Sequence, residues 1–400
     1  MIVNVCEKDI LEILSKGSMV GKYQSHEVYP MSDKPIGYLA DHFILKLKTS
    51  RESREFFLKA VPINVEKRTE YLDETGFFTR EVQIYETLIP ILLSGSSLSW
   101  APECYVARDE HYIIMEILND YKNKSTKDLV LDFEHLKIAS STLAVFHASS
   151  LIYEENCETE IAGKFLGMLK ENAYPQIEGH VRQKGLENAI EVLMELIKLI
   201  PKYENSINEI LRKFPETLRK IYKFVEPSTT FKNVISHGDL WVNNIMFAYD
   251  DEKPTTCKFI DFQLARYAPP AFDLAQLIFI NSTTETRAQH LDDVLNTYCD
   301  SFESELKRAG IESSILPSTE ILQTFKGFHL AGLIEAALFG HLTLLPSTLS
   351  TSIMSSSEEY NKFINESRIK TCLKAFEEDY YKDRLTEILS EIIDEFILKN

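Results

Sequence analysis

No Cys-x-x-Cys pair occurs in this chain, and its six cysteines are dispersed over 400 residues. Structural zinc sites and disulfide frameworks show paired or regularly spaced cysteines, so the sequence indicates neither. Reduced and mostly buried thiols are the expectation instead, as is typical of proteins in the cytoplasm. We therefore predict a cytoplasmic location.

Long hydrophobic runs are also missing. The N-terminal stretch MIVNVCEKDILEIL has charges among its apolar residues and lacks a small-residue cleavage site, so no secretory signal is indicated. The most apolar later run, AGLIEAALFGHLTLL, is only about 15 residues long and contains Glu335 and His341. We expect a buried helix there, and no membrane partner.

Positive charge is in deficit, because 43 Lys and Arg stand against 61 Asp and Glu, a formal charge of −18. Such a chain repels nucleic-acid backbones and anionic membranes, so no nucleic-acid partner is expected. A nucleotide bound with metal ions stays compatible, since a local site can oppose the global charge. The apolar fraction of 44% and the charged fraction of 26% are those of an ordinary globular protein.

The first third of the chain mixes strand and helix patterns. HFILKLKTS (42–50) alternates apolar and polar residues, and EFFLKAVP (55–62) follows a short charged link, so a hairpin is predicted. The stretch 75–94 has apolar residues at helical spacing. Two further strands follow, with a turn near Asp109. The predicted order is strand, strand, helix, strand, strand.

Helical patterns dominate the rest. Asp132 is the predicted N-cap of a long helix. Residues 181–224 are helical by pattern, with interruptions near Pro201 and Pro215, and the Ser/Thr-rich stretch 344–360 predicts a mobile loop. Three short apolar strands are predicted between these helices, at 234–236, 244–250 and 257–262.

We therefore predict an α+β, bilobal fold. The small antiparallel-sheet N-lobe would span 1–117, the hinge 118–121, and the mainly helical C-lobe 122–400. Clefts between lobes are favoured sites for small molecules, so the binding site is expected near the hinge.

A polar stretch between two apolar strands, VISHGDLWVNNIMF (234–247), gives the strongest chemical signal. It matches His-x-Asp-x-x-x-x-Asn, and the later FIDFQ places Asp261 after another strand. We expect Asp239, Asn244 and Asp261 at the ends of adjacent strands. One aspartate can orient the proton of an attacking hydroxyl, while the other and the asparagine hold Mg²⁺ against nucleotide phosphates. The alternative is a surface turn that contains Asp and Asn; the following IDF favours phosphoryl transfer.

Two further residues fit the same chemistry. Lys59 lies in FFLKAV on the second predicted strand, and Glu81 lies in FTREVQIY on the first predicted helix. A strand lysine paired with a helix glutamate can hold the phosphates of ATP. Each residue alone is a weak signal, because a strand lysine is usually just solvated.

HGDLWVNN, FIDFQ, FFLKAV and REVQIYETLIP together resemble the insect ecdysteroid-kinase-like family. That family is part of the choline-kinase-like and aminoglycoside-phosphotransferase-like branch of the protein-kinase fold. The resemblance runs over roughly 30–345. It implies an ATP- and Mg²⁺-dependent kinase with Asp239 as catalytic base, Asn244 and Asp261 as magnesium ligands, and Lys59, paired with Glu81, on the phosphates.

The resemblance also assigns the hinge. Met115 would be the gatekeeper, and backbone groups of Glu116 and Leu118 would bond the adenine. His237 would hold the catalytic loop, and Asp273 would cap a helix and brace the same loop.

Three positions depart from related kinases. The segment that should cover the phosphates, SDKPIGYLADHF, has the single glycine Gly37, so close backbone approach to phosphate is less assured. Ile117 stands where the family commonly has an acidic residue. Gln263 ends the stretch Asp261-Phe262-Gln263, where protein kinases have a glycine.

A small-molecule alcohol is the expected acceptor. Only 12 positions separate Asp261 from Asp273, which leaves no room for a long activation loop, and position 238 is a glycine rather than a loop-reading arginine. The resemblance implies an ecdysteroid or another lipophilic alcohol. Trp241 would pack either on a flat substrate or in the core.

Two alternatives stay open. One is a non-catalytic, pseudokinase-like binding protein, which the glycine-poor segment motivates. The other is a choline or amino-alcohol kinase, which would need an aromatic and acidic cage that no motif marks. The sequence does not give the oligomeric state.

Overall fold

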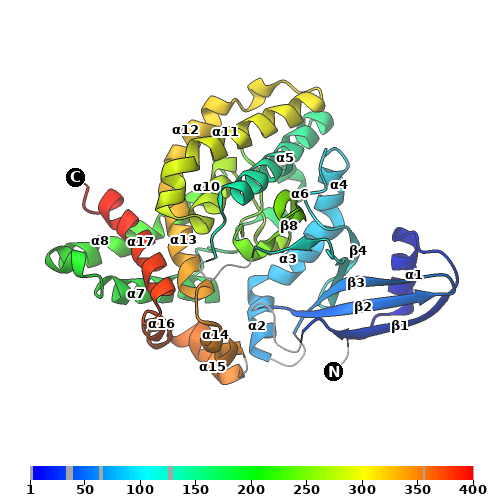
Figure 1. The fold of residues 1–400 in the computed structure, drawn as a ribbon, viewed down its shortest axis with the longest axis horizontal. Helices are drawn as coiled ribbons and strands as arrows, with labels where there is room; N and C mark the ends of the chain where they lie inside the picture. Colours follow the sequence, from blue (N-terminus) through cyan, green and yellow to red (C-terminus); the bar gives the residue numbers. More distant parts are fainter. Residues whose placement is uncertain (1–2, 33–38, 63–65, 125–128, 355, 400) are drawn as a thin grey trace.

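The computed structural model describes residues 3–32, 39–62, 66–124, 129–354 and 356–399. An antiparallel sheet forms the N-terminal part and helices form most of the remainder, so the predicted α+β class is confirmed (Figure 1). The division into lobes at residues 117 and 121 stays a prediction. The glycine-poor segment around Gly37 falls outside the described residues.

The N-terminal sheet has five strands in the order β1-β2-β3-β5-β4. Its strands are β1 (Tyr23–Pro30), β2 (Asp41–Thr49), β3 (Ser53–Ala60), β4 (Cys104–Arg108) and β5 (Tyr112–Glu116). The predicted hairpin is β2–β3, with Phe43 opposite Leu58. Helix α1 (Glu7–Lys16) was not predicted; it buries Ile10 and Ile13 against the sheet. Strand β1 was missed as well, because it is almost wholly exposed and lacks apolar alternation.

The stretch expected to be one helix at 75–94 is helical but irregular. It consists of α3 (Phe77–Gln83), the π-turn η1 (Ile84–Leu88) and α4 (Ile89–Leu93), and α2 (Glu66–Thr75) precedes it. The wide turn comes just before Pro90, which has no N–H to donate and crowds the preceding turn. Helix α3 carries Glu81, so this segment sets the position of one predicted site residue.

Two long helices, α5 (Phe133–Cys157) and α11 (Thr284–Arg308), pack together in the helical part. Asp132 caps α5 as predicted, because its carboxylate accepts the His135 N–H at 3.1 Å. The other helical segments are α6 (Ile161–Leu169), α7 (Val181–Ile197), η2 (Pro201–Ser206), α8 (Ile207–Arg219), α9 (Ile221–Phe224), α10 (Pro270–Asn281), η5 (Ser313–Ile315), α12 (Ser318–Gly327), α13 (His329–Thr343), α14 (Ser347–Met354), α15 (Ser357–Asn361), η6 (Lys362–Glu366), α16 (Ile369–Ala375) and α17 (Asp379–Phe396).

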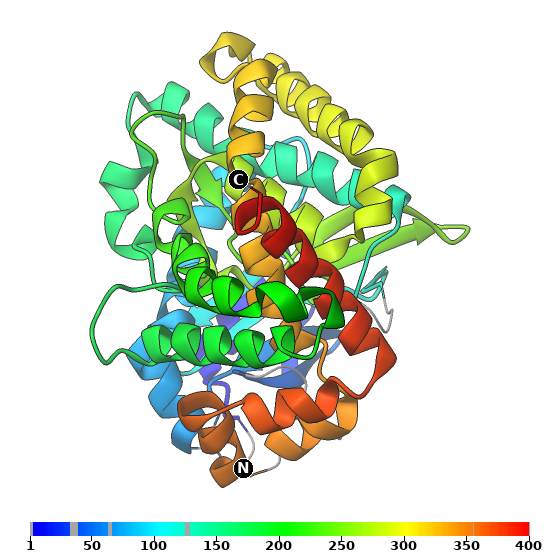
Figure 2. The same ribbon diagram turned by 90° about the vertical axis from the view of Figure 1, so that its left-hand side faces the viewer.

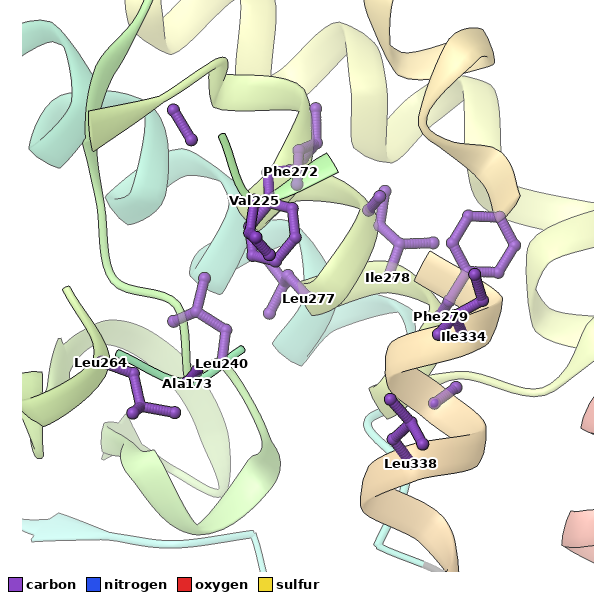
Figure 3. Packing of buried hydrophobic residues seen from close by; sticks show 14 of the residues in the cluster. Ala173, Val225, Leu240, Leu264, Phe272, Leu277, Ile278, Phe279, Ile334 and Leu338 are labelled. Carbon is purple, nitrogen blue, oxygen red and sulfur yellow. The ribbon is translucent and has the colours of Figure 1, made fainter. Parts of the chain in front are cut away.

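Helix α13 is the buried helix expected from AGLIEAALFGHLTLL. It packs on α10 and α17, and the crossing of α17 over α13 is visible in Figure 2. Gly332 permits the approach to α10, since a β-carbon there would lie 2.3 Å from the ring of Phe279. Ile334 and Leu338 continue the apolar contact surface of α13 (Figure 3).

No single helix in the described ranges is both long and apolar enough to cross a membrane. The pair His329–Thr343 and Ser347–Ile353 passes such a test by length and composition, with a bend of 77° between its members. All six cysteines are free; Cys257, Cys299 and Cys372 are buried, whereas Cys6 and Cys157 are exposed. The expectation of mostly buried thiols therefore holds for only half of them.

Two predictions of irregular structure were wrong. The stretch 344–360 forms α14 and α15 instead of a loop, because Ile353 and Tyr360 bury their side chains in the core and fix the helices there. Helix α8 runs through Pro215, since the buried Phe214 and Leu218 outweigh the hydrogen bond that the proline loses.

The short strands form two small sheets. Strand β7 (Val234–Ser236) pairs with β10 (Arg266–Ala268), whereas β8 (Ile245–Asp250) lies between β6 (Tyr121–Lys122) and β9 (Lys253–Phe259). The expectation that the site residues follow adjacent strands is thus wrong for Asp239, because β7 does not pair with β8 or β9. Loops, rather than sheet pairing, bring the residues together.

Candidate active site

The loop after β7 turns sharply at Gly238. Its backbone has φ +77°, and a β-carbon there would lie 2.4 Å from the carbonyl oxygen of Leu264. The loop is anchored by Leu240, which is fully buried and lies near Leu264 and Leu277 in Figure 3. Glycine is therefore required at this turn on steric grounds alone.

Three polar side chains of α10 hold this loop. The Asp273 carboxylate accepts the backbone N–H groups of His237 and, at 2.9 Å, of Gly238. Gln276 accepts the Leu240 N–H at 2.8 Å and donates to the Gly238 carbonyl at 3.0 Å. Asn281 donates to the Leu240 carbonyl at 2.7 Å.

These contacts confirm the brace expected of Asp273 but not the helix cap, since Pro269 occupies the N-cap position of α10. Gln276 and Asn281 were not predicted from the sequence. Their signal was present: in PAFDLAQLIFIN they are polar residues in an otherwise apolar helix, and all three bracing side chains are fully buried.

His237 joins the loop to the segment after β9. Its Nε2 lies 3.0 Å from the carbonyl oxygen of Ile260, and its Nδ1 accepts the backbone N–H of Asp239 at 3.2 Å. A carbonyl only accepts, so the proton sits on Nε2 and the ring is neutral. Burial lowers the pKa of His237 and thereby favours this neutral form.

Asp239 and Asn244 are in direct contact. The Asn244 amide donates to both the backbone carbonyl and the carboxylate of Asp239, at 2.9 Å each. Burial raises the pKa of Asp239 well above its usual value, the negative charge of Asp261 raises it further, and the Asn244 bond opposes the shift. A buried carboxylate with a raised pKa is a candidate general base.

Lys59, Glu81 and Asp261 form an ion-pair chain in which Lys59 and Glu81 are buried and Asp261 is half-buried. The Lys59 ammonium lies 2.6 Å from Glu81 and 3.1 Å from Asp261. Burial lowers the Lys59 pKa, but the charges of Asp261 and Glu81 outweigh it, so the net shift is upward and the lysine is charged. Burial raises the pKa of Glu81, and Lys59 opposes that shift.

Asp261 itself adopts a left-handed backbone conformation with φ +69°, which aspartate tolerates better than most residues. Together with Asp239 and Glu81 it gives three carboxylates against the one ammonium of Lys59. Carboxylate and amide oxygens are the ligands that Mg²⁺ prefers, so Asp261, Asn244 and Asp239 fit a bound cation.

One cavity of about 1030 Å³ contains all of these groups. Its lining includes every predicted site residue: Lys59, Glu81, Met115, Glu116, Leu118, Asp239, Asn244 and Asp261. The Glu116 N–H donates to the Glu103 carbonyl at 2.9 Å, and its carboxylate pairs with Lys258. The structure thus places all of these predicted site residues around one cavity, as their proposed roles require.

The remainder of the cavity is largely apolar. Trp241 lines it while packing half-buried against the core, so its core packing is confirmed, and its contact with a flat substrate stays a prediction. The apolar and aromatic lining of this half comes from α2, α3, α7, α13, α15, η6 and the segment before α7, and includes Tyr71, Phe77, Tyr174, Val181, Leu186, Leu338, Phe339, Leu342, Tyr360 and Phe363. Of the aromatic residues between 165 and 224, Phe165, Tyr203 and Phe214 lie in the core instead.

Comparison with known proteins gives one match to a family. The model of the ecdysteroid kinase-like family matches residues 40–311, more than half of the chain. A search of curated proteins finds no match.

Solved structures show a weaker likeness. An ethanolamine kinase from Plasmodium vivax aligns over 90% of this chain and 84% of its own, with 14% identity and a TM-score of 0.40. The GDP complex of aminoglycoside 2′-phosphotransferase-IIIa aligns over 94% of this chain and 98% of its own, with 13% identity and a TM-score of 0.40.

Proposed function

Because the chain belongs to the ecdysteroid kinase-like family, we propose that it is a kinase that transfers a phosphoryl group from Mg²⁺–ATP to a hydroxyl of a lipophilic alcohol. An ecdysteroid is one such acceptor. The observation that carries the proposal is the contact of Lys59 with both Glu81 and Asp261, residues of three separate elements, next to Asp239 and Asn244 in one cavity. A cytoplasmic location is part of the proposal.

In this mechanism Asp239 orients the acceptor hydroxyl and takes its proton, for which a raised pKa is suited. The hydroxyl oxygen forms a bond to the γ-phosphorus while the bond from that phosphorus to the β-phosphate oxygen breaks, and ADP leaves. Asn244 and Asp261 would hold Mg²⁺, which when bound would supply positive charge opposite the phosphates. Lys59, fixed by Glu81, contributes its positive charge to the phosphates, and Asn244 also fixes the Asp239 carboxylate.

The hinge segment completes the nucleotide site. Met115, Glu116 and Leu118 line the cavity beside Lys59, where backbone groups of Glu116 and Leu118 would bond the adenine. The Leu118 carbonyl accepts the Tyr121 N–H at 3.1 Å, which closes a turn at this point.

Thermal unfolding of the purified chain tests the nucleotide site. We expect a rise in Tm with ATP and Mg²⁺ together that exceeds the sum of the rises with each alone, because ligand binding stabilises the folded state. A parallel mass-spectrometric screen of ecdysteroids, choline and plant phenolics would detect the mass gain of one phosphoryl group. A chain without metal-dependent nucleotide binding and without any phosphorylated product would refute the proposal.

The alternative, a non-catalytic binding protein, rests on the single glycine in the segment expected to cover the phosphates. The same two measurements separate it from the kinase. A binding protein would be stabilised by an acceptor-like compound but would form no product under any combination of nucleotide and metal.

A further inference from the structure

Two arginines line the apolar half of the cavity. Arg182 lies in the first turn of α7, and Arg368 directly precedes α16. These two helices pack side by side (Figure 1). Arg368 is only 6% exposed, and Arg182 is half-buried and lines the cavity.

The partners of both guanidinium groups are neutral. Arg182 donates to the Ala173 carbonyl at 2.8 Å and to the Tyr71 hydroxyl at 3.1 Å. Arg368 donates to the Phe363 carbonyl at 3.1 Å, and its Nη1 lies 3.1 Å from Nε2 of His341.

His341 cannot balance the charge of Arg368. A guanidinium only donates, so Nε2 of His341 accepts and the ring is neutral. Burial and, to a lesser extent, the Arg368 charge lower the pKa of His341 to about 3, so the neutral form is kept at every physiological pH.

No carboxylate pairs with either arginine in the described part of the chain. Glu171, whose charge also acts on Arg182, is itself in a salt bridge with Arg266 at 3.2 Å. Aromatic rings offer only partial compensation: Arg182 lies 5.5 Å from the ring centroid of Phe77, and Arg368 lies 5.6 Å from that of Phe363.

A donor group on each arginine is left for a ligand. Across the described residues, Nη2 of Arg182 and Nη2 of Arg368 have no hydrogen-bond partner, and both side chains face the cavity. Buried charges without a counter-charge are costly, so a site of this kind is stabilised when an anion enters. Guanidinium groups bind carboxylate and similar oxyanions with paired, charge-assisted hydrogen bonds.

We propose that the acceptor of this kinase carries an anionic oxygen group, such as a carboxylate, which Arg182 and Arg368 bind while its apolar body contacts the aromatic lining. The inference rests on the proposed function and adds a substrate class to it: lipophilic hydroxy acids or acidic conjugates of lipophilic alcohols. A cationic amino alcohol such as choline would meet two like charges in this half of the cavity.

Matched pairs of compounds test the inference by binding alone. Isothermal titration of the wild-type chain, with ADP and Mg²⁺ present, would compare hydroxy acids with their uncharged methyl esters, for example cholic acid and methyl cholate. At least one acid should bind about tenfold more tightly than its ester or more, the effect of one hydrogen bond to a charged group. Sulfated steroids, each compared with its unsulfated counterpart, form a second set of pairs that tests whether the anionic group is a sulfate.

Variants locate the effect. Arg182→Gln and Arg368→Gln should each reduce the affinity for the acid toward that of the ester. Arg219→Gln is the control, because Arg219 is an exposed arginine of the neighbouring α8 that pairs with Glu187 at 2.6 Å; it should keep the full preference. Circular dichroism would verify folding, and Arg182→Gln keeps the test valid if the more buried Arg368 variant does not fold.

The outcomes separate this inference from the proposed function. If no charged compound binds more tightly than its uncharged partner, or if the preference survives in Arg182→Gln, the inference is overturned. The kinase proposal would still stand wherever Mg²⁺-dependent nucleotide binding and transfer to a neutral alcohol are observed. Loss of nucleotide binding in the wild-type chain would instead remove the proposed function itself.

Discussion

In the half of the cavity formed by β3, α3 and the loops after β7 and β9, Lys59 is held directly between the carboxylates of Glu81 and Asp261. In the apolar half, two arginines contact carbonyl groups, a hydroxyl, a neutral imidazole and aromatic rings. The first half has three carboxylates against one ammonium group, an excess of negative charge. The second carries uncompensated positive charge, so each half favours a ligand of opposite sign.

Asp239→Asn, in the first half of the cavity, should have the largest of the expected effects, a loss of catalytic rate. Removal of the proposed base should reduce kcat by about two to four orders of magnitude. Initial rates on a verified acceptor would measure it. Asp250→Asn, at an exposed aspartate that ends β8, is the matched control and should keep the wild-type rate. An unchanged kcat in Asp239→Asn would exclude Asp239 as the base.

The same variant should gain stability, which gives a second readout. The folded-state pKa of Asp239 is raised, so its protonated form is favoured by folding, and stability is lost as pH rises through that pKa. Without ligands at neutral pH, Asp239→Asn should therefore have a higher free energy of unfolding than the wild-type chain. The gain should vanish below about pH 4, where the wild-type aspartate is protonated in both states. Urea unfolding at both pH values would reveal it, and a loss of stability at neutral pH would contradict the assigned shift.

Lys59→Met should strongly destabilise the folded protein, because it breaks the ion pair in the first half of the cavity. It leaves Glu81 buried without its partner, a change worth about 3 to 5 kcal/mol in the free energy of unfolding. The double variant Lys59→Met with Glu81→Leu removes both charges and should recover much of the loss. Urea denaturation of the two single variants and the double variant forms a complete cycle. Additive losses would show that the pair is not coupled.

Gly238→Ala separates backbone strain from steric conflict in the catalytic loop. Gly238 and Gly310 have the same φ of +77°, but only at Gly238 does an added β-carbon meet other atoms within 4 Å. Gly310→Ala should cost about 1 kcal/mol for the left-handed backbone alone, and Gly238→Ala about 1 to 3 kcal/mol more. Thermal unfolding of both variants would give the difference. Equal losses of stability in the two variants would mean that the loop accommodates the added β-carbon without an energetic cost.

Arg182→Gln should have the smallest effect on stability without ligand. The lost hydrogen bonds are offset by relief of a buried charge that has a second arginine nearby, so the free energy of unfolding should change by less than about 1 kcal/mol. Urea unfolding would compare it with Lys59→Met. A loss as large as that of the lysine variant would show that Arg182 is structural rather than poised for a ligand.

The two halves also differed in what the sequence could predict. Lys59, Glu81, Asp239, Asn244 and Asp261 were predicted because each interrupts a strongly apolar strand or helix pattern in a known order. These residues line one cavity, although β7 pairs with β10 rather than with its expected neighbours. Local patterns predict such residues because each lies within an apolar strand or helix or close after one.

The two arginines of the apolar half were not predicted, because their roles depend on contacts in three dimensions. Arg182 and Arg368 lie in ordinary polar contexts. Tyr360 of α15 lines the same cavity, and α14 and α15 form a stretch whose serine-rich composition had suggested a loop. Buried Ile353 and Tyr360 determine those helices through long-range packing. Periodicity over a short window carries no information about such contacts.

Helix α2 runs into α3 with only Gly76 between them. Tyr71 on the first helix receives a hydrogen bond from Arg182, and Glu81 on the second receives one from Lys59. The pair α2–α3 thus contacts both halves of the cavity. A displacement of this pair that weakens binding in one half would therefore also change binding in the other.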